Sequence, residues 1–400
     1  MFERALTPLL RRAARQYPIV NLTGPRQSGK TTLAKKVFPG HAYVSLEDPD
    51  SRQFALEDPR GFLAQFKGKV ILDEIQRTPD LFSYLQAIVD TNPKAGQYIL
   101  TGSQNFLLLA RVTQSLAGRC AILHLLPLSH AELGRRRAMP LDTIGRRLPA
   151  RKRNGDSDFA PLLHTGFYPR IHDKGLDAHQ WLSNYYQSYV ERDVREVVNV
   201  GDLETFGRFV RLCGGRSGQL LNLSSLGADC GVSHSTASRW LSLLQASFIV
   251  HLLRPHHKNF NKRLIKSPKL YFLDTGLLCY LLNIRRPGDL HIHSMRGPIF
   301  ETFVVAELVK AAYSSGSRAD DIYFWRDQQG NEIDILMDNG QLLTPIEVKS
   351  GQTIVADHFA SLRFWRELPG QETAPASLVY GGVDSYMRNK VAVYSWKDWL

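Results

Sequence analysis

The most informative segment of this 400-residue chain is Gly24-Pro25-Arg26-Gln27-Ser28-Gly29-Lys30-Thr31. It fits the pattern G-x-x-x-x-G-K-[ST] at every fixed position. The apolar run from Ile19 to Leu22 predicts a buried strand before it, and Thr32 opens a segment typical of a helix. A strand, a glycine-rich turn and a helix start allow backbone N–H groups to surround phosphates. The chain is therefore predicted to bind a nucleoside triphosphate.

The residue types of this loop, the Walker A pattern, each have a chemical reason. Gly24 and Gly29 permit backbone conformations and close approaches that a Cβ would obstruct. Lys30 is expected to place its ammonium on the β- and γ-phosphates, and the Thr31 hydroxyl is expected to ligate Mg²⁺. The segment from Gly24 to Thr32 is thus the predicted site for ATP and Mg²⁺.

An acidic motif of the Walker B type follows an apolar run further along the chain. In Lys69-Val70-Ile71-Leu72-Asp73-Glu74 the strand ends in two carboxylates. Asp73 is expected to hold Mg²⁺ through water, and Glu74 is expected to polarise the attacking water. The adjacent Asp-Glu pair favours a self-sufficient ATPase of the additional-strand type.

A third strand, from Tyr98 to Thr101, is expected to lie between the first two. Either Ser103 or Asn105, at its end, is a candidate for the polar residue that senses the nucleotide. Gly118-Arg119 precedes another apolar run, and Arg119 is a candidate to stabilise charge on the γ-phosphate, in cis or from a neighbouring subunit. Arg111 is a weaker rival. Action in trans would require a homo-oligomer.

These motifs together resemble the AAA-type ATPases. The matching words are GPRQSGKTTL, VILDEIQ, YILTGSQNF, SLAGR and LLPLSHAEL. More closely, they are similar to a largely uncharacterised prokaryotic family whose ATPase core is joined to a winged helix and a nuclease-like domain. The resemblance implies an α/β fold built on a parallel P-loop sheet. It also implies four segments: an ATPase core over 1–134, a helical connector or lid over 135–215, a winged helix over 216–288 and a nuclease-like α/β domain over 289–400.

The predicted winged helix has its own signature. A short helix from Leu223, a turn containing Gly231 and a second helix from Ser235 to Leu244 form a helix-turn-helix pattern. The runs 248–253 and 269–272 are expected to be the strands of the wing. In a DNA-reading version, the exposed face of the second helix would carry Ser235, Thr236, Ser238 and Arg239. Winged helices also dock proteins, so DNA and a protein both remain candidate partners.

The C-terminal third contains a predicted hairpin. Asn339-Gly340 between apolar-alternating runs indicates a two-residue type I′ turn. That turn would place Asp338 opposite Gln341 and Asp334 opposite Pro345. Because side chains alternate along each strand, one face would carry four charged residues, with Asp334 diagonal to Glu347. They are Glu332, Asp334, Glu347 and Lys349.

This arrangement resembles the restriction-endonuclease-like PD-(D/E)xK fold. The resemblance implies that Asp334 and Glu347 ligate a second divalent metal and that Lys349 orients or activates the water. Glu301, preferred to Glu307, would complete the site from a preceding helix. The fold also serves as a binding module. The leading interpretation is a Mg²⁺-dependent ATPase whose hydrolysis drives a conformational change in a C-terminal module that interacts with DNA or protein. The alternatives are an ATP-gated, metal-dependent DNA nuclease and a non-catalytic regulator that binds a protein.

Composition and charge indicate which classes of protein and which partners are compatible with these interpretations. The chain is 43% hydrophobic and 22% charged, as in ordinary globular proteins, and has no run of about 18 apolar residues that would predict a membrane span. No secretory signal is visible, and the four cysteines are too widely spaced for a zinc cluster or disulfide scaffold, which favours the cytoplasm. The net charge of +12 favours a polyanion such as DNA or a solvated basic face. Part of this excess is local, at Arg135-Arg136-Arg137, Arg146-Arg147, Arg151-Lys152-Arg153 and Lys258 to Lys269.

Overall fold

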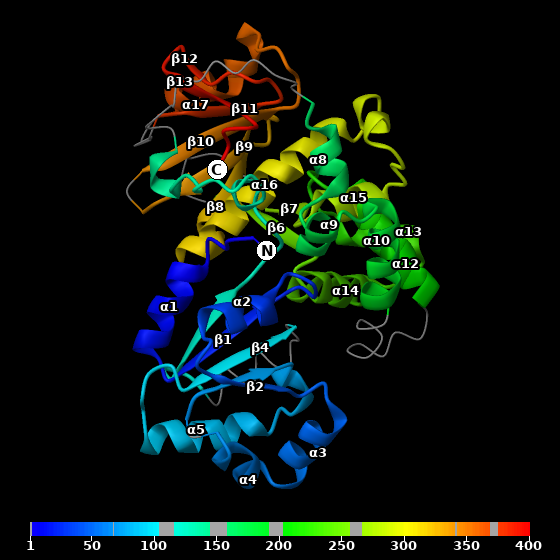
Figure 1. Ribbon diagram of the computed structural model, residues 1–400. Coiled ribbons are helices and arrows are strands. Elements are labelled where there is room, and N and C mark those ends of the chain that lie inside the picture. The colour runs from blue at the N-terminus through cyan, green and yellow to red at the C-terminus, as the bar shows by residue number, and fades with distance from the viewer. Residues whose placement is uncertain are drawn as a thin grey trace.

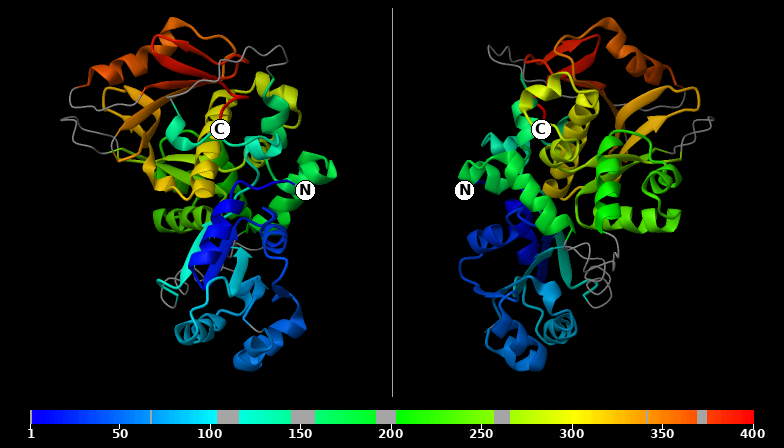
Figure 2. Two further views of the ribbon diagram at one scale, coloured as in Figure 1. Left: turned by 60° about the vertical axis from the view of Figure 1, so that its left-hand side comes forward. Right: turned by 90° about the vertical axis from the view of Figure 1, so that its right-hand side faces the viewer.

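Two β-sheets lie at opposite ends of the molecule, with helices between them (Figures 1 and 2). The structure is a computed structural model that describes residues 2–66, 68–103, 116–144, 158–191, 203–256, 266–340, 342–368 and 375–400. In Figure 1 the amino terminus lies between the sheets, and the carboxyl terminus lies beside the second sheet. The amino-terminal segment is thus close to both halves of the protein.

The first sheet is parallel and five-stranded, in the order β2-β3-β4-β1-β5. Its strands are β1 (Ile19–Gly24), β2 (Ala42–Ser45), β3 (Val70–Asp73), β4 (Tyr98–Ser103) and β5 (Cys120–His124). β1 and β3 are buried along their whole length, which explains their mostly apolar sequences. β4 pairs with β1 on one side and β3 on the other, so the predicted inserted strand is confirmed.

Helices pack around this sheet and bring the loops at its carboxyl edge into place. They are α1 (Thr7–Gln16), α2 (Lys30–Val37), α3 (Pro49–Glu57), α4 (Pro59–Ala64), η1 (Ile75–Arg77), α5 (Leu81–Thr91) and α7 (His130–Leu133). α2 begins directly after Gly29, whose φ of 93° lies in the left-handed region that favours glycine. The loop-to-helix transition expected from the sequence is confirmed.

The middle of the chain is helical and ends in a hairpin. Its elements are η2 (Leu141–Thr143), α8 (Ala160–Thr165), α9 (Pro169–Lys174), α10 (Ala178–Tyr185), η3 (Tyr186–Glu191), α12 (Leu203–Gly215), α13 (Leu223–Cys230), α14 (His234–Ala246), β6 (Val250–Pro255) and β7 (Lys269–Phe272). Between α13 and α14, Gly231 adopts a left-handed φ of 74° and Ser233 caps α14 by accepting from the Thr236 N–H. The expected pair of helices and its glycine turn are present.

The second sheet is mixed and has eight strands, in the order β12-β13-β11-β10-β9-β8-β6-β7. The elements that follow β7 are α15 (Thr275–Leu281), η4 (Pro287–His291), α16 (Arg296–Ser315), η5 (Ala319–Asp321), β8 (Ile322–Arg326), β9 (Glu332–Asp338), β10 (Leu343–Lys349), η6 (Ala356–Phe359), α17 (Ala360–Glu367), β11 (Ser377–Tyr380), β12 (Tyr386–Arg388) and β13 (Val391–Ser395). β6 pairs in parallel with β8, so the hairpin expected as a wing forms the edge of this sheet. One hydrophobic core extends from Leu126 to Leu400 and joins the helices to the sheet.

The hairpin of β9 and β10 differs from its predicted register. Leu343, rather than Gln341, lies opposite Asp338, so the two-residue turn was wrong and the loop is two residues longer. Asn339 Oδ1 accepts from the Leu342 N–H at 2.7 Å, and Asp338 Oδ1 accepts from the Gly340 N–H at 2.8 Å. These side-chain bonds close the turn without a type I′ backbone. A shift of two residues preserves which face each side chain occupies.

Two further predictions concern membrane-spanning helices and the cysteines. No helix in the described ranges combines the length and the apolar character that a membrane crossing requires. All four cysteines are free thiols, as their spacing indicated.

Candidate functional site

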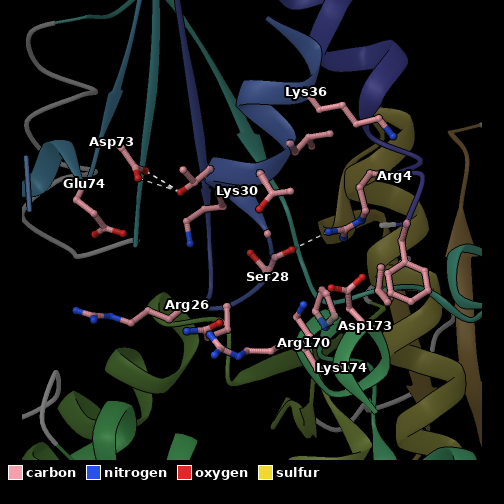
Figure 3. Close-up of a pocket in the computed structure, with 18 of the residues that line it drawn as sticks. Arg4, Arg26, Ser28, Lys30, Lys36, Asp73, Glu74, Arg170, Asp173 and Lys174 are labelled. Carbon is pink, nitrogen blue, oxygen red and sulfur yellow. Dashed lines mark hydrogen bonds between the residues drawn. The ribbon is translucent and has the colours of Figure 1, made fainter. Parts of the chain in front are cut away.

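A cleft of about 600 Å³ lies at the carboxyl edge of the first sheet. Its walls come from residues 26–33 of the P-loop and α2, from the end of β3, from the amino-terminal segment and from α9. Figure 3 shows Lys30 and Ser28 on one side of this space and Arg170 and Lys174 approaching from another segment. The P-loop therefore opens onto a cleft that two parts of the chain build together.

Lys30 occupies the interior of the P-loop. Its Nζ donates to the carbonyl oxygens of Gly24 at 3.1 Å and Pro25 at 2.8 Å, and the side chain is buried. Burial lowers the pKa of Lys30 to about 8. A Cβ on Gly24 would lie 2.1 Å from the Leu125 carbonyl oxygen, so only glycine fits where β1 passes β5. An ammonium bonded only to neutral carbonyls is well matched to an incoming phosphate.

Three hydroxyl groups surround the Asp73 carboxylate. Thr31 Oγ1 lies 3.0 Å from both carboxylate oxygens, Tyr43 Oη donates to Oδ2 at 2.9 Å, and Thr101 Oγ1 donates to Oδ1. Burial, reinforced by Asp73, raises the pKa of Tyr43 to about 12. Thr31 and Asp73 are thus held next to each other, as a Mg²⁺ site with a hydroxyl and a carboxylate requires.

Tyr43→Phe is expected to raise the Mg²⁺ concentration for half-maximal ATP hydrolysis by about tenfold, because the donor that orients Asp73 is removed. The Lys35 ammonium, 3.3 Å from the Tyr43 ring centroid, keeps the ring in place in both proteins. The measurement is a Mg²⁺ titration of phosphate release at saturating ATP. Tyr84→Phe on α5 is the control. Superimposable titrations for Tyr43→Phe and wild type would exclude the role.

Glu74 follows β3 in a left-handed conformation with φ of 57°, which turns its side chain toward the cleft. Gln76 Nε2 donates to Glu74 Oε2. A glutamine two residues downstream therefore holds the carboxylate predicted to act on water. The sequence word VILDEIQ contains this residue, but the pattern alone does not indicate the contact.

Of three further candidates from the sequence, one lies in the described part of the chain. The backbone of Ser103 pairs with Gly24 at the end of β4, at the edge where the P-loop begins. Asn105 and Arg111 lie outside the described residues.

Arg119 lies at the opposite edge of the sheet. It precedes Cys120, which pairs with Ile19 at the start of β1, whereas the P-loop follows the end of β1. Its Nη2 donates to Asp90 Oδ2 at 3.0 Å. Action of Arg119 on the γ-phosphate in cis is therefore wrong, because the length of β1, about 20 Å at 3.3 Å per residue, separates the two positions.

Cations outside the predicted site line the cleft instead. Arg4 comes from the segment before α1, and Arg170 and Lys174 come from α9. Pro169 starts α9, so Arg170 lies in its first turn, while the buried Ile171 anchors the helix. The motif Gly166-Phe167-Tyr168-Pro169-Arg170 can be recognised in the sequence. Its arginine could not be assigned to the nucleotide cleft, because the P-loop is far from it along the chain.

A second charged cluster lies in the C-terminal half. Lys269 of β7 is buried, and its Nζ contacts Glu301 Oε1 of α16 at 3.2 Å and also Glu332 of β9. Burial opposes the charge on Lys269, but the carboxylates of Glu301, Asp334 and Glu332 outweigh it and raise the pKa of Lys269. Burial raises the pKa of Glu301 to about 7. Lys269 was not among the predicted site residues.

The other predicted members of this cluster are close by. Lys349 Nζ lies 2.7 Å from Glu347 Oε1, and the Val348 N–H donates to Asp334 Oδ2 at 2.8 Å. Burial, followed by the nearby Asp334, raises the pKa of Glu347 to about 8. Within the described ranges, no group of three or more His, Cys, Asp or Glu side chains is arranged to hold a metal. The structure therefore gives no support to a second metal site.

The helix-turn-helix presents a mostly neutral surface. Ser235 and Arg239 on α14 are exposed, whereas Thr236 and Ser238 are half-buried. Ser233 Oγ and Ser235 Oγ lie 2.9 Å apart. Much of the basic run from Lys258 to Lys269 lies outside the described residues, which omit 257–265, and so do residues 145–157 with their arginines.

Taken together, the parallel sheet, the inserted β4, the P-loop after β1 and the acidic pair after β3 define a P-loop domain of the AAA type. Residues 16–134 match a family described as "AAA domain". Residues 156–288 and 296–399 match two families described as "Domain of unknown function", DUF8612 and DUF4143.

The chain belongs to the same family as the "Uncharacterized protein Rv2008c" of Mycobacterium tuberculosis and the "Uncharacterized protein Mb2031c" of Mycobacterium bovis. It is 30% identical to each over 347 residues, which cover 86% of this chain and 73% of the relative. Among solved structures, it is similar to the Walker-type ATPase PABY2304 of Pyrococcus abyssi, with 13% identity, a TM-score of 0.46, and coverage of 70% of this chain and 96% of that one.

Proposed function

We propose that this protein is a Mg²⁺-dependent ATPase whose cycle changes the position of its C-terminal half. The observation that carries the proposal is the cleft itself, which is built by the P-loop, Asp73 and Glu74 on one side and by α9 on the other. A nucleotide in such a cleft contacts both parts of the chain. Binding and hydrolysis therefore change the free energy of their relative arrangement.

The residues present fit ATP. Lys30 is bonded only to loop carbonyls, and Ser28 Oγ is buried without a hydrogen-bond partner among the described residues. Phe2, Leu128 and Pro169 supply an apolar part of the lining that suits a base. Lys30 and Arg170 would neutralise phosphate charge, and Glu74 would accept a proton from the attacking water.

The same residues fit Mg²⁺. The hydroxyl of Thr31 and the carboxylate of Asp73 would hold the ion, which would supply charge neutralisation on the phosphates. Tyr43 and Thr101 keep the carboxylate oriented. Glu74 is separate from this group of residues, because its carboxylate accepts a hydrogen bond from the Gln76 amide rather than from the hydroxyl groups.

The moving half carries the helix-turn-helix and the mixed sheet, and DNA is the partner to test first because of the net charge of +12. ATP hydrolysis is measured with and without duplex DNA at low salt. Stimulation that weakens as salt rises would support DNA. Absence of both binding and stimulation would favour the protein-partner alternative. Metal-dependent cleavage of plasmid that is lost in Glu347→Ala with Lys349→Ala would support the nuclease alternative.

Arg170→Ala is expected to lower kcat/KM for ATP by about tenfold or more, because a hydrogen bond to a charged group is lost. The measurement is steady-state phosphate release over a range of ATP concentrations. Arg60→Ala, an exposed residue on α4 that does not line the cleft, is the matched control. Unchanged kinetics in Arg170→Ala would remove α9 from the nucleotide site.

A further inference from the structure

Arg4 lies between the P-loop and the segment that follows β5. Its Nη1 donates to the Ser28 carbonyl at 2.7 Å, and its Nη2 donates to the Leu126 carbonyl at 2.6 Å. Figure 3 shows the guanidinium directed at Ser28. Arg4 precedes the residues 16–134 that match the AAA domain. Arg4 therefore contacts the P-loop from outside the residues that match the AAA domain.

Glu132 fixes the orientation of this arginine. Arg4 Nε lies 3.2 Å from Glu132 Oε1, and each side chain is only 8% exposed. The same carboxylate accepts from the Ala5 N–H at 2.6 Å and, through Oε2, from the Ser129 N–H at 2.9 Å. A buried carboxylate with several donors has little freedom to turn, so Arg4 and α7 move as one unit.

The other end of this unit rests on α16. The His130 N–H donates to Glu307 Oε2 at 2.8 Å, and Lys310 Nζ contacts Glu307 Oε1 at 2.8 Å and donates to the Leu128 carbonyl at 3.0 Å. Glu307 and Lys310 are buried. Because their charges are paired inside the protein, breaking this contact would cost more than breaking a surface ion pair.

Hydrogen bonds and the Arg4–Glu132 ion pair thus form a continuous path from the P-loop to the long helix of the C-terminal half. It runs from the Ser28 carbonyl through Arg4, Glu132 and the start of α7 to Glu307 on α16. α16 also carries Glu301, which joins Lys269 of β7. If the P-loop is displaced, either the residues of this path move with it or one of the contacts between them breaks.

We propose that Arg4 is a positioning residue for ATP hydrolysis and couples the P-loop to α16 through Glu132 and α7. The inference rests on the proposed ATPase function. When Lys30 leaves the Gly24 and Pro25 carbonyls for a phosphate, the P-loop loses two internal hydrogen bonds, and Ser28 belongs to the same loop. Only a guanidinium has donors arranged to reach Ser28, Leu126 and Glu132 together, so lysine does not replace it.

The test compares Arg4→Lys and Glu132→Gln with wild type and with the control Arg11→Lys, which alters an exposed arginine on α1. ATP affinity, kcat and the nucleotide-dependent hydrogen exchange of residues 296–307 are measured on the full chain. In wild type and Arg11→Lys, ATP is expected to change exchange in α16 by about fivefold or more. Glu132→Gln, which does not line the nucleotide cleft, is expected to bind ATP but to lose this response, and Arg4→Lys is expected to lose the response together with kcat.

Each possible result of this experiment bears on the coupling between the P-loop and α16. A full response of α16 in Glu132→Gln and Arg4→Lys, with ATP bound, would overturn the coupling. Hydrolysis by wild type without any response of α16 would overturn the coupling but leave the ATPase proposal standing. Failure of wild type to hydrolyse ATP would overturn both. If Arg4→Lys does not fold, the result for Glu132→Gln alone decides, since it changes one oxygen to an amide.

Discussion

Glu74→Gln is expected to leave ATP binding intact and to lower turnover by about 10²–10⁴-fold, the usual contribution of a general base. Glutamine keeps the shape of the side chain but does not accept a proton from water. Lys30, Thr31 and Asp73, the residues expected to hold ATP and Mg²⁺, are unchanged in this variant. ATP affinity is measured with a fluorescent analogue, and turnover is measured by phosphate release in a single-turnover experiment.

The control is Glu47→Gln, which removes an exposed carboxylate from the lining of the same cleft. It should hydrolyse ATP at the wild-type rate. Equal rates for Glu74→Gln and wild type would remove Glu74 from the reaction. A parallel loss of binding and turnover would instead indicate that Glu74 supports the fold of the loop, because a base lost from a preserved site affects the chemical step alone.

Lys269→Met is expected to destabilise the C-terminal half by about 3–5 kcal/mol, because Glu301 and Glu332 are left as mostly buried carboxylates without their shared cation. Arg326 Nη1, 3.0 Å from Glu332 Oε2, compensates only one of the two. The shift is measured as the change in the midpoint of urea unfolding, followed by a probe in the second sheet. The aliphatic part of methionine preserves packing, so the effect reports the charge.

Lys266→Met is the matched control, since Lys266 is an exposed lysine just before β7. It should unfold like wild type. Adding Glu301→Gln to Lys269→Met should recover part of the loss, because the uncompensated charge is removed with its partner. A midpoint for Lys269→Met that equals that of Lys266→Met would show that the cluster adds nothing to stability.

Much of the nucleotide site could be predicted from the sequence. Asp73 ends the apolar strand β3, and the P-loop with Lys30 and Thr31 follows the mostly apolar strand β1. Parallel strands bring such residues to one edge of the sheet. The position of β4 between β1 and β3 was expected from the additional-strand class of ATPase that Asp73-Glu74 favours. The cis role of Arg119 was wrong, because Arg119 precedes β5 and parallel strands place such a residue at the amino edge of the sheet, away from the P-loop.

The C-terminal cluster was predicted in part. Glu347 and Lys349 share a face because alternation along a strand is a local property, and the error of two residues in the turn preserved it. Asn339-Gly340 alone could not reveal that side chains of Asp338 and Asn339 would close a longer loop. Lys269 was missed because its partners Glu301 and Glu332 come from other elements of the chain.

The P-loop and the acidic pair could be recognised in the sequence as a nucleotide site, because each is a local pattern of backbone conformation and residue type over a few positions. The cations around that site and its connections to the rest of the chain follow from the tertiary structure. Arg4, Arg170 and Lys174 reach the cleft, and Arg119 does not, because sheet order, strand length and helix packing bring together residues far apart in the chain. Such long-range contacts depend on how the elements pack and leave no periodic signal in the residues that make them.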